Sequence, residues 1–343
     1  MSAKRALLAT AAAFACLTAT ACVTTTNAAT SPGGGAASGY PVTISNCGKD
    51  YTFNTAPSRV VVMNGGSVAE VSSMLALGLG DRIIANAQSY GASDVPGRVD
   101  EIAKLPTGGV KLNDMMDIPR EAMIGLRPDF VISTYDGGFR PEAGFATRDD
   151  LRAVGANSYA PASSCLGVGK VSGTPSIADS YQLLRDLGKI FGVGDRAERL
   201  IAESERRIAT MTAKVKDLPK QKVMLIIPGM AMGGEFSSVG GNGIWNDIFA
   251  KAGAENAFAG VTDDIFANLS REQVAAADVD ALLVVNFMSQ DPDADARKLL
   301  DQFPQWDAAR TKRYVVLSDS IYFGPSNDVA VERLARAVHP EAF

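Results

Sequence analysis

Short runs rich in β-branched residues alternate with longer helical patterns along most of this chain, and this alternation limits the fold more than any other feature. Strands are expected at residues 59–63, 81–85, 128–133 and 157–160. Apolar residues at helical spacing predict helices at 68–77 and 118–126. Strands that alternate with helices in this way indicate parallel α/β units.

A long, charge-rich helical stretch from about Ser176 to Leu218 divides the chain, with a break expected near Gly192–Gly194. Beyond it the alternation restarts, with strands expected at 221–227, 281–285 and 313–317 and helices at 243–252 and 328–338. The predicted fold class is therefore α/β, with two lobes around mostly parallel central sheets. One long helix joins the lobes, and a ligand cleft lies between them.

The first residues have the pattern of a secretory signal, because Lys4 and Arg5 precede an uncharged run over 6–21. This run is shorter than the roughly 20 residues that span a bilayer. Cys22 follows Ala19-Thr-Ala and resembles a lipidation site, although Ala19 stands where Leu is usual; Cys16, inside the run, is a second candidate. The alternative is simple cleavage after Ala21 and release of a soluble protein.

Residues 23–39 consist mainly of Thr, Ala, Ser and Gly, which is typical of a flexible linker. The predicted organisation is therefore a signal peptide over 1–21, a lipidated cysteine and linker over 22–39, an N-terminal lobe over 40–172, a connecting helix over 173–220 and a C-terminal lobe over 221–343. We expect the protein outside the cytoplasm, held on the cell membrane by its lipid anchor.

Two cysteines, Cys47 and Cys165, lie in the body of the chain. An even pair in an exported protein predicts a disulfide, with two free thiols as the alternative.

The sequence lacks the motifs of several common classes of enzyme and of nucleic-acid-binding proteins. It has one histidine, His339, and neither a phosphate-binding Walker loop nor a GxSxG elbow. Its net charge of −5 and the lack of a basic run exclude nucleic acid as a partner. We expect no catalytic residue, no resident metal and no cofactor. The alternative to a protein without catalytic residues is an enzyme on the same two-lobed scaffold, with Asp136 and Glu235 as a pair of catalytic carboxylates.

A series of motifs spans nearly all of the chain from Tyr40 onward: Ala56–Val62, Leu75–Ile83, Glu121–Ile132, Ala252–Phe258, Leu269–Val274 and Val331–Pro340. In this order and spacing the chain resembles the iron-siderophore and cobalamin type of ABC-importer substrate-binding proteins. The resemblance implies a monomer that captures a ferric siderophore and delivers it to an ABC permease with a cytoplasmic ATPase. Cobalamin or haem is the alternative cargo, and a sensor without a permease is a further alternative.

The resemblance also implies that Glu121 and Glu272, one on each lobe, dock onto basic residues of the permease. The plainer interpretation is that both are first-turn carboxylates favoured by the helix dipole.

Ligands of open α/β sheets bind at the carboxyl ends of the strands, which selects the residues expected to line the cleft. Arg140 is expected to pair with anionic oxygens of the chelate, unless it is a surface arginine. The predicted ligand-binding residues are Asn64, Tyr90, Tyr135, Arg140, Met230, Phe236, Phe287 and Tyr322.

Overall fold

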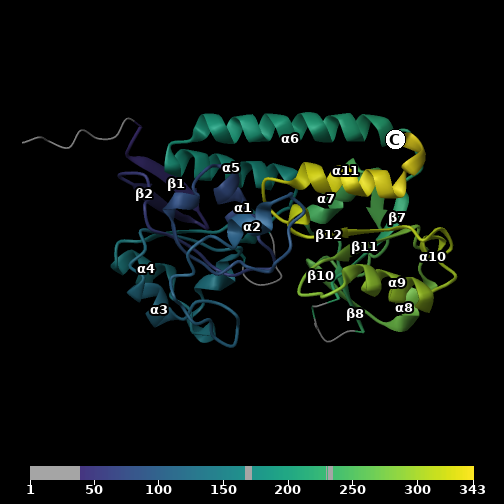
Figure 1. Cartoon of the computed structure of the whole chain (residues 1–343), viewed down its shortest axis with the longest axis horizontal. Coiled ribbons are helices and arrows are strands. Elements are labelled where there is room, and N and C mark those ends of the chain that lie inside the picture. The colour runs from purple at the N-terminus through teal and green to yellow at the C-terminus, as the bar shows by residue number, and fades with distance from the viewer. Residues whose placement is uncertain (1–38, 167–171, 229, 231–234) are drawn as a thin grey trace, which may run out of the picture. The chain divides into compact units, whose positions relative to one another are not determined.

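Two four-stranded parallel sheets form the framework of the protein in the computed structural model (Figure 1). The structure describes residues 39–166, 172–228, 230 and 235–343. The predicted signal peptide, Cys22 and all but the last residue of the predicted linker lie outside the described residues. No helix in the described part is both long and apolar enough to cross a bilayer.

The first sheet has the strand order β4-β3-β5-β6, and we call the part of the chain around it lobe one. Its central strands are buried on both faces, which is why they read as continuous apolar runs in the sequence. An antiparallel hairpin of β1 (Val42–Asn46) and β2 (Lys49–Phe53) lies beside it. The other elements of lobe one are β3 (Val60–Val62), α1 (Ala69–Ala76), β4 (Ile83–Asn86), α2 (Arg98–Ile102), α3 (Arg120–Gly125), β5 (Phe130–Ile132), α4 (Arg148–Ala153) and β6 (Asn157–Tyr159).

The second sheet repeats this arrangement in the order β12-β11-β7-β9, and we call the part around it lobe two. In each sheet the strand that comes first in the sequence, β3 or β7, is internal and pairs with a neighbour on both sides. The elements of lobe two are β7 (Gln221–Ile226), β8 (Phe236–Val239), α7 (Ile244–Lys251), β9 (Ala254–Asn256), β10 (Phe266–Leu269), α8 (Arg271–Ala276), β11 (Ala281–Val285), α9 (Pro292–Gln302), α10 (Asp307–Thr311), β12 (Tyr314–Leu317) and α11 (Asn327–Val338). Strands β8 and β10 pair antiparallel outside the parallel sheet.

The helical link between the lobes consists of α5 (Ile177–Phe191) and α6 (Gly194–Val215). The side chain of Ser176 caps the start of α5, and Gly192 ends that helix in the left-handed region, at φ 69°. The break predicted near Gly192 is thereby confirmed. Helix α6 is the long connecting helix, and in Figure 1 it runs above both α5 and α11.

One apolar core extends through both lobes. It contains Val62 of the first sheet, Leu283 of the second, and Leu187, Ile208 and Leu334 of the helices α5, α6 and α11 that cover them. A smaller core fills the opposite face of each sheet. The lobes are therefore joined by shared packing as well as by the chain itself, and the predicted α/β fold with two parallel sheets is confirmed.

A polar contact adds to this junction. The carboxylate of Asp94 in lobe one accepts hydrogen bonds from the backbone N–H groups of Ser318 and Ser320, at 2.7 and 3.1 Å, and pairs with Arg333 at 2.7 Å. In return, Asp319 of lobe two accepts a hydrogen bond from the backbone N–H of Asp94 at 2.7 Å. Each lobe thus binds the backbone of the other through a carboxylate, which opposes rotation between them.

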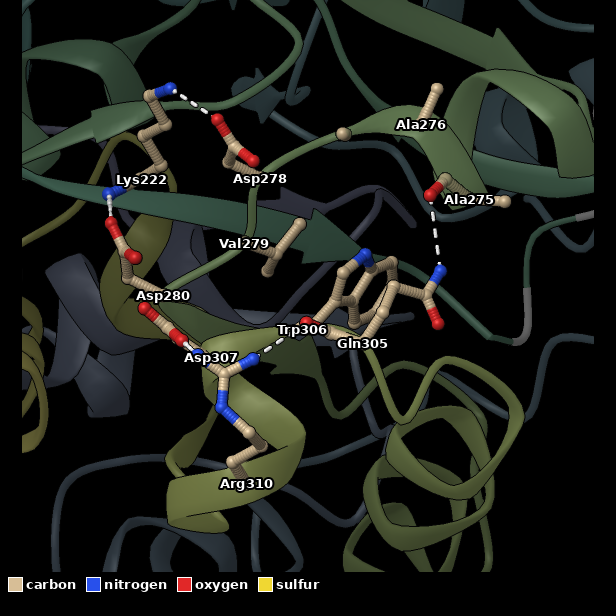
Figure 2. Close-up of a pocket in the computed structure, with 11 residues that line it drawn as sticks. Lys222, Ala275, Ala276, Asp278, Val279, Asp280, Gln305, Trp306, Asp307 and Arg310 are labelled. Atoms are coloured by element: carbon tan, nitrogen blue, oxygen red, sulfur yellow. Dashed lines mark hydrogen bonds and ion pairs between the residues drawn. The ribbon is translucent and has the colours of Figure 1, made fainter.

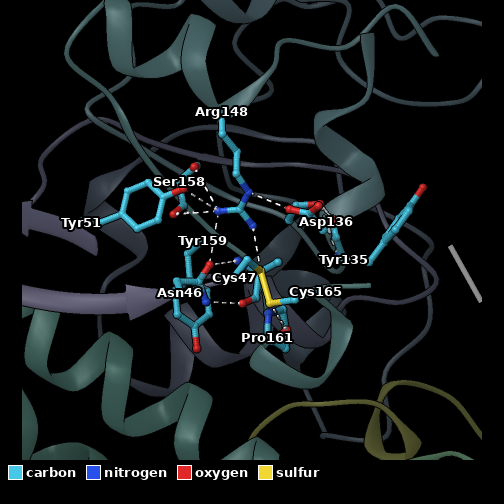
Figure 3. Close-up of a disulfide and its surroundings, with 12 residues drawn as sticks. Asn46, Cys47, Tyr51, Tyr135, Asp136, Arg148, Ser158, Tyr159, Pro161 and Cys165 are labelled. Carbon is cyan, nitrogen blue, oxygen red and sulfur yellow. Dashed lines mark hydrogen bonds and ion pairs between the residues drawn. A yellow bond between two sulfur atoms is a disulfide. The ribbon is translucent and has the colours of Figure 1, made fainter. Parts of the chain in front are cut away.

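The predicted disulfide is present and links Cys47, in the turn between β1 and β2, to Cys165 after β6 (Figure 3). Beside it Arg148 is only 8% exposed, and its guanidinium lies 4.4 Å from the centre of the Phe139 ring. Arg148 pairs with Asp136 at 2.7 Å and donates to the Asn46 side chain at 3.2 Å. This cluster holds the loop after β5 against the hairpin.

Candidate functional site

A cavity of about 300 Å³ lies between the two lobes. This volume is at the lower end of the range for ligand-binding sites, roughly 300–1,000 Å³. Its walls include Asn64, Gly65, Tyr90, Asp117, Thr134 and Tyr135 from lobe one, and Met230, Ile265, Phe266, Phe287, Tyr322 and Phe323 from lobe two.

The strand order explains why the cavity lies here. In each sheet the chain leaves the central pair of strands, β3 and β5 or β7 and β11, toward opposite sides, and such a switch point opens a crevice at the carboxyl ends. Asn64, Tyr135, Met230 and Phe287 come soon after the ends of these four strands. Gly65 meets the loop after β5 so closely that a Cβ atom would collide with Thr134. The cavity therefore joins the switch points of both sheets.

Asn64 organises the polar side of the cavity. Its side-chain oxygen accepts a hydrogen bond from the Tyr90 hydroxyl at 2.7 Å, and its amide nitrogen donates to the carbonyl of Met116. Its backbone N–H donates to Oδ1 of Asp117 at 3.0 Å, and the N–H of Ile118 donates to the same oxygen at 2.7 Å. No described residue donates to Oδ2 of Asp117. Burial raises the pKa of this carboxyl to about 6.

Three tyrosines present their rings or hydroxyls to the same space. Burial raises the pKa of Tyr90 to about 12, and it also raises the pKa values of Tyr135 and Tyr322. All three hydroxyls are therefore protonated at neutral pH. The ring of Tyr90 lies 5.4 Å from that of Phe287, centre to centre, so that an aromatic contact crosses between the lobes.

A second acid lies behind the cavity wall. Glu70 of α1 is 1% exposed and accepts a hydrogen bond from the Gln88 side chain at 2.7 Å. Burial raises the pKa of Glu70. The sequence prediction missed both Glu70 and Asp117, because the rule of strand ends selects neither the first turn of a helix nor a segment that leads into a helix.

The structure brings six of the eight predicted ligand-binding residues to the cavity: Asn64, Tyr90, Tyr135, Met230, Phe287 and Tyr322. Arg140 and Phe236 are not among the residues that line it. Nε of Arg140 donates to the carbonyl of Gly137 at 3.1 Å, because a 3₁₀ turn over Asp136–Phe139 folds the chain back. Phe236 is buried beside Phe303, with ring centres 5.7 Å apart, in the core of lobe two.

The carboxylates considered for an enzyme do not form a catalytic pair. Asp136 binds Arg148 at 2.7 Å, and Glu235 binds Arg271 in lobe two. Within the described ranges, no three His, Cys, Asp or Glu side chains gather as a metal site would need. His339 is buried at the end of α11, with Nε2 3.0 Å from the carbonyl of Gly253.

A second hollow, of about 550 Å³, lies in lobe two near the amino ends of β7 and β11 (Figure 2). Its charged groups already have partners: Lys222 binds Asp278 at 3.0 Å, and Arg310 binds Asp307. It lies at the end of the sheet opposite to the one where α/β proteins bind ligands. The cavity between the lobes is therefore the candidate site.

Glu121 and Glu272 occupy matching places, each the second residue of a short helix and each preceded by an arginine. The Glu121 side chain is 84% exposed and pairs with Arg120 at 2.6 Å. The pKa of Glu272 is lowered, first by a hydrogen bond from Ser270. Figure 1 shows α3 and α8 on the side of their lobes away from α6. Both carboxylates are thus exposed, one on each lobe.

Residues 61–320 match the family model described as periplasmic binding protein. The chain belongs to the periplasmic binding protein family. This assignment makes it a substrate-binding protein of the kind that serves ABC transporters, not an enzyme. The fold and the cavity between two α/β lobes agree with that role.

Solved structures resemble this periplasmic binding protein over most of its length. One is a periplasmic binding protein from Veillonella parvula, with 22% identity, 87% of this chain and 97% of that chain covered, and a TM-score of 0.71. Another is described as an ABC-type Fe³⁺-hydroxamate transport system from Saccharomonospora viridis, with 25% identity, 88% and 98% covered, and a TM-score of 0.67. A third is a periplasmic haem-binding protein from Roseiflexus, with 24% identity, 83% and 99% covered, and a TM-score of 0.64. No curated protein matches the sequence significantly.

Proposed function

We propose that this protein captures a ferric siderophore in the cavity between its lobes and delivers it to an ABC permease. The observation that carries the proposal is one cavity at the switch points of both sheets, walled by tyrosine, phenylalanine and methionine. Aromatic walls suit a chelate with apolar faces, and a few fixed polar groups orient it. The chelate would be held partly inside the cavity, since the enclosed volume is small.

A hydroxamate chelate is the preferred cargo. Protonated hydroxyls, such as that of Tyr135, can donate hydrogen bonds to the oxygens around the iron. The structure from Saccharomonospora viridis, which is described as a Fe³⁺-hydroxamate system, supports the same class. Haem and cobalamin are the alternative cargoes, and the first test must distinguish them from a ferric hydroxamate.

The test is a titration of the protein's intrinsic fluorescence with ferric hydroxamate chelates, ferric catecholate chelates, haemin and cobalamin. We expect saturable quenching by ferric hydroxamate, weakened in Phe287→Ala and unchanged in Phe343→Ala, which removes a C-terminal ring away from the cavity. Saturable quenching by haemin or cobalamin alone would show that this compound, and not a ferric hydroxamate, is the cargo. If none of the four compounds binds, the proposal fails.

The exposed pair Glu121 and Glu272 would dock the loaded protein onto the permease, where separated carboxylates fix the register with basic residues. The double variant Glu121→Arg and Glu272→Arg should abolish uptake while the affinity for the chelate stays at the wild-type value. Glu142→Arg, an exposed glutamate elsewhere on lobe one, is the matched control. Normal uptake by the double variant would rule out this docking mode.

We also propose that Cys22 carries the lipid anchor and that residues 22–39 tether the protein to the membrane. In cells, Cys22→Ala should move the protein from the membrane fraction to the soluble fraction. Cys16→Ala should leave it on the membrane. The opposite result would place the modified cysteine at position 16.

A further inference from the structure

We propose that Asp117 selects the cargo by charge, so that the site accepts a chelate with a positive or hydrogen-bond-donating arm and disfavours an anionic one. This inference rests on the proposed function, because it specifies which ferric chelates the same cavity takes. It replaces the expectation that Arg140 receives an anionic chelate.

The first observation is the geometry of the carboxylate. Asp117 is 5% exposed, and both backbone N–H groups that bind it, those of Asn64 and Ile118, use the same oxygen, Oδ1. Asp117 lines the cavity, and its Oδ2 receives no hydrogen bond from a described residue. Oδ2 is not among the fully buried unpaired atoms of the described residues, so it faces the space of the cavity, where a ligand can donate to it.

The second observation is the electrostatic character of the wall. Among the residues described, Asp117 is the one charged side chain that lines the cavity. Asp117 acts electrostatically on Tyr90 and Tyr135, and both hydroxyls are protonated at neutral pH, so neither neutralises the carboxylate. Arg140 acts on Tyr135 but is held by the carbonyl of Gly137. Apolar walls strengthen the field of the carboxylate, so the arm of a chelate that reaches it must be cationic or a donor.

The segment that carries Asp117 also offers apolar contacts to such an arm. Met115 and Met116 directly precede it, line the cavity and are 60% and 42% exposed. Exposed thioether side chains suit the methylene groups of a flexible arm. A linear chelate that ends in an ammonium group would place its methylenes on the methionines and its charge on Oδ2.

The test uses one linear ferric trihydroxamate in three forms: with a free terminal amine, with the amine acetylated, and with the amine succinylated. The arm is then cationic, neutral or anionic around the same iron centre. Affinities are measured by calorimetry at pH 7.5 for the wild-type protein, Asp117→Asn and Asp114→Asn. Asp114 is the matched control, since it is exposed, lies three residues earlier and does not line the cavity.

We expect the wild type to bind the cationic form at least about tenfold more tightly than the anionic form, as for a hydrogen bond to a charged group. Asp117→Asn should reduce this ratio to within about twofold, and Asp114→Asn should leave it intact. Equal binding of all three forms by the wild type would overturn the role of Asp117 while leaving the proposed function standing. Binding of no form would instead contradict the proposed function. A melting curve of each variant confirms that it is folded.

Discussion

Replacing Asp117 by asparagine should make the protein more stable at neutral pH. In this variant the side-chain oxygen of the new amide can keep both backbone hydrogen bonds of Oδ1, while the amide nitrogen takes the place of Oδ2. Burial raises the pKa of Asp117 from 3.8 to about 6. A difference of about two pKa units, at about 1.4 kcal/mol each, gives a gain of up to about 3 kcal/mol in the free energy of unfolding.

The pH dependence follows from the direction of this shift. A carboxyl with a raised pKa in the folded state destabilises the protein once it ionises, so wild-type stability falls as the pH rises from about 4 through about 6. The variant lacks this titration, and its advantage should be absent at pH 4 and complete above pH 7. The raised pKa of Glu70 acts in the same direction but is common to both proteins, so it cancels.

Urea unfolding at pH 4, 5, 6 and 7.5 measures this difference, with Asp114→Asn as the control that removes an exposed charge. An advantage that does not change with pH, or a loss of stability at pH 7.5, would refute the assignment of Asp117 as an ionised and unpaired acid. Together with weaker binding of a cationic chelate, the predicted gain would show that this residue is kept for binding at the expense of stability.

Three further predictions concern the elements that hold the site. Asp94→Asn should lower the free energy of unfolding by about 1.5–3 kcal/mol in urea, because the buried carboxylate loses its charge-assisted bonds to Arg333 and to the backbone of lobe two; a loss below about 0.5 kcal/mol would contradict this role. Arg148→Met should cost a similar amount, because the buried Asn46 loses a charged donor, and it should weaken chelate binding in calorimetry, because Asp136, next to Tyr135, loses its ion pair; an unchanged affinity would show that this cluster does not support the site. Replacing Cys47 and Cys165 by Ser opens a loop of 118 residues and should cost about 5 kcal/mol on the chain-entropy model, measured by thermal unfolding; an unchanged melting temperature would contradict that value.

The sequence predicted seven of the eight parallel strands of the described residues, because most buried parallel strands are apolar runs between turns; it missed the edge strand β9, which has only three residues. It did not reveal the antiparallel pairs. Strand β1 alternates buried and exposed residues over only five positions, and β8 and β10 are four residues each and contain serine, alanine and asparagine. Such segments gain their partners from the tertiary structure, and their local pattern is too short to predict a strand.

The sequence predicted those site residues that directly follow a strand. It failed where the direction of the side chain decides whether a residue reaches the cavity. Asn64 and Phe287 follow strands closely, so topology alone brings them to the cavity. Arg140 follows a 3₁₀ turn, and its guanidinium donates to the carbonyl of Gly137 within that turn. The pattern of apolar residues in the sequence does not predict this contact. Asp117 reaches the cavity through its contact with the backbone of Asn64, 53 residues away in sequence.

The most direct test of the account is a crystal structure of the protein with a bound ferric hydroxamate. We predict that the chelate lies between the lobes, against Tyr90 and Tyr135 on one side and Phe287 and Tyr322 on the other. Iron density at any other place, such as the hollow beside Trp306, would contradict the account.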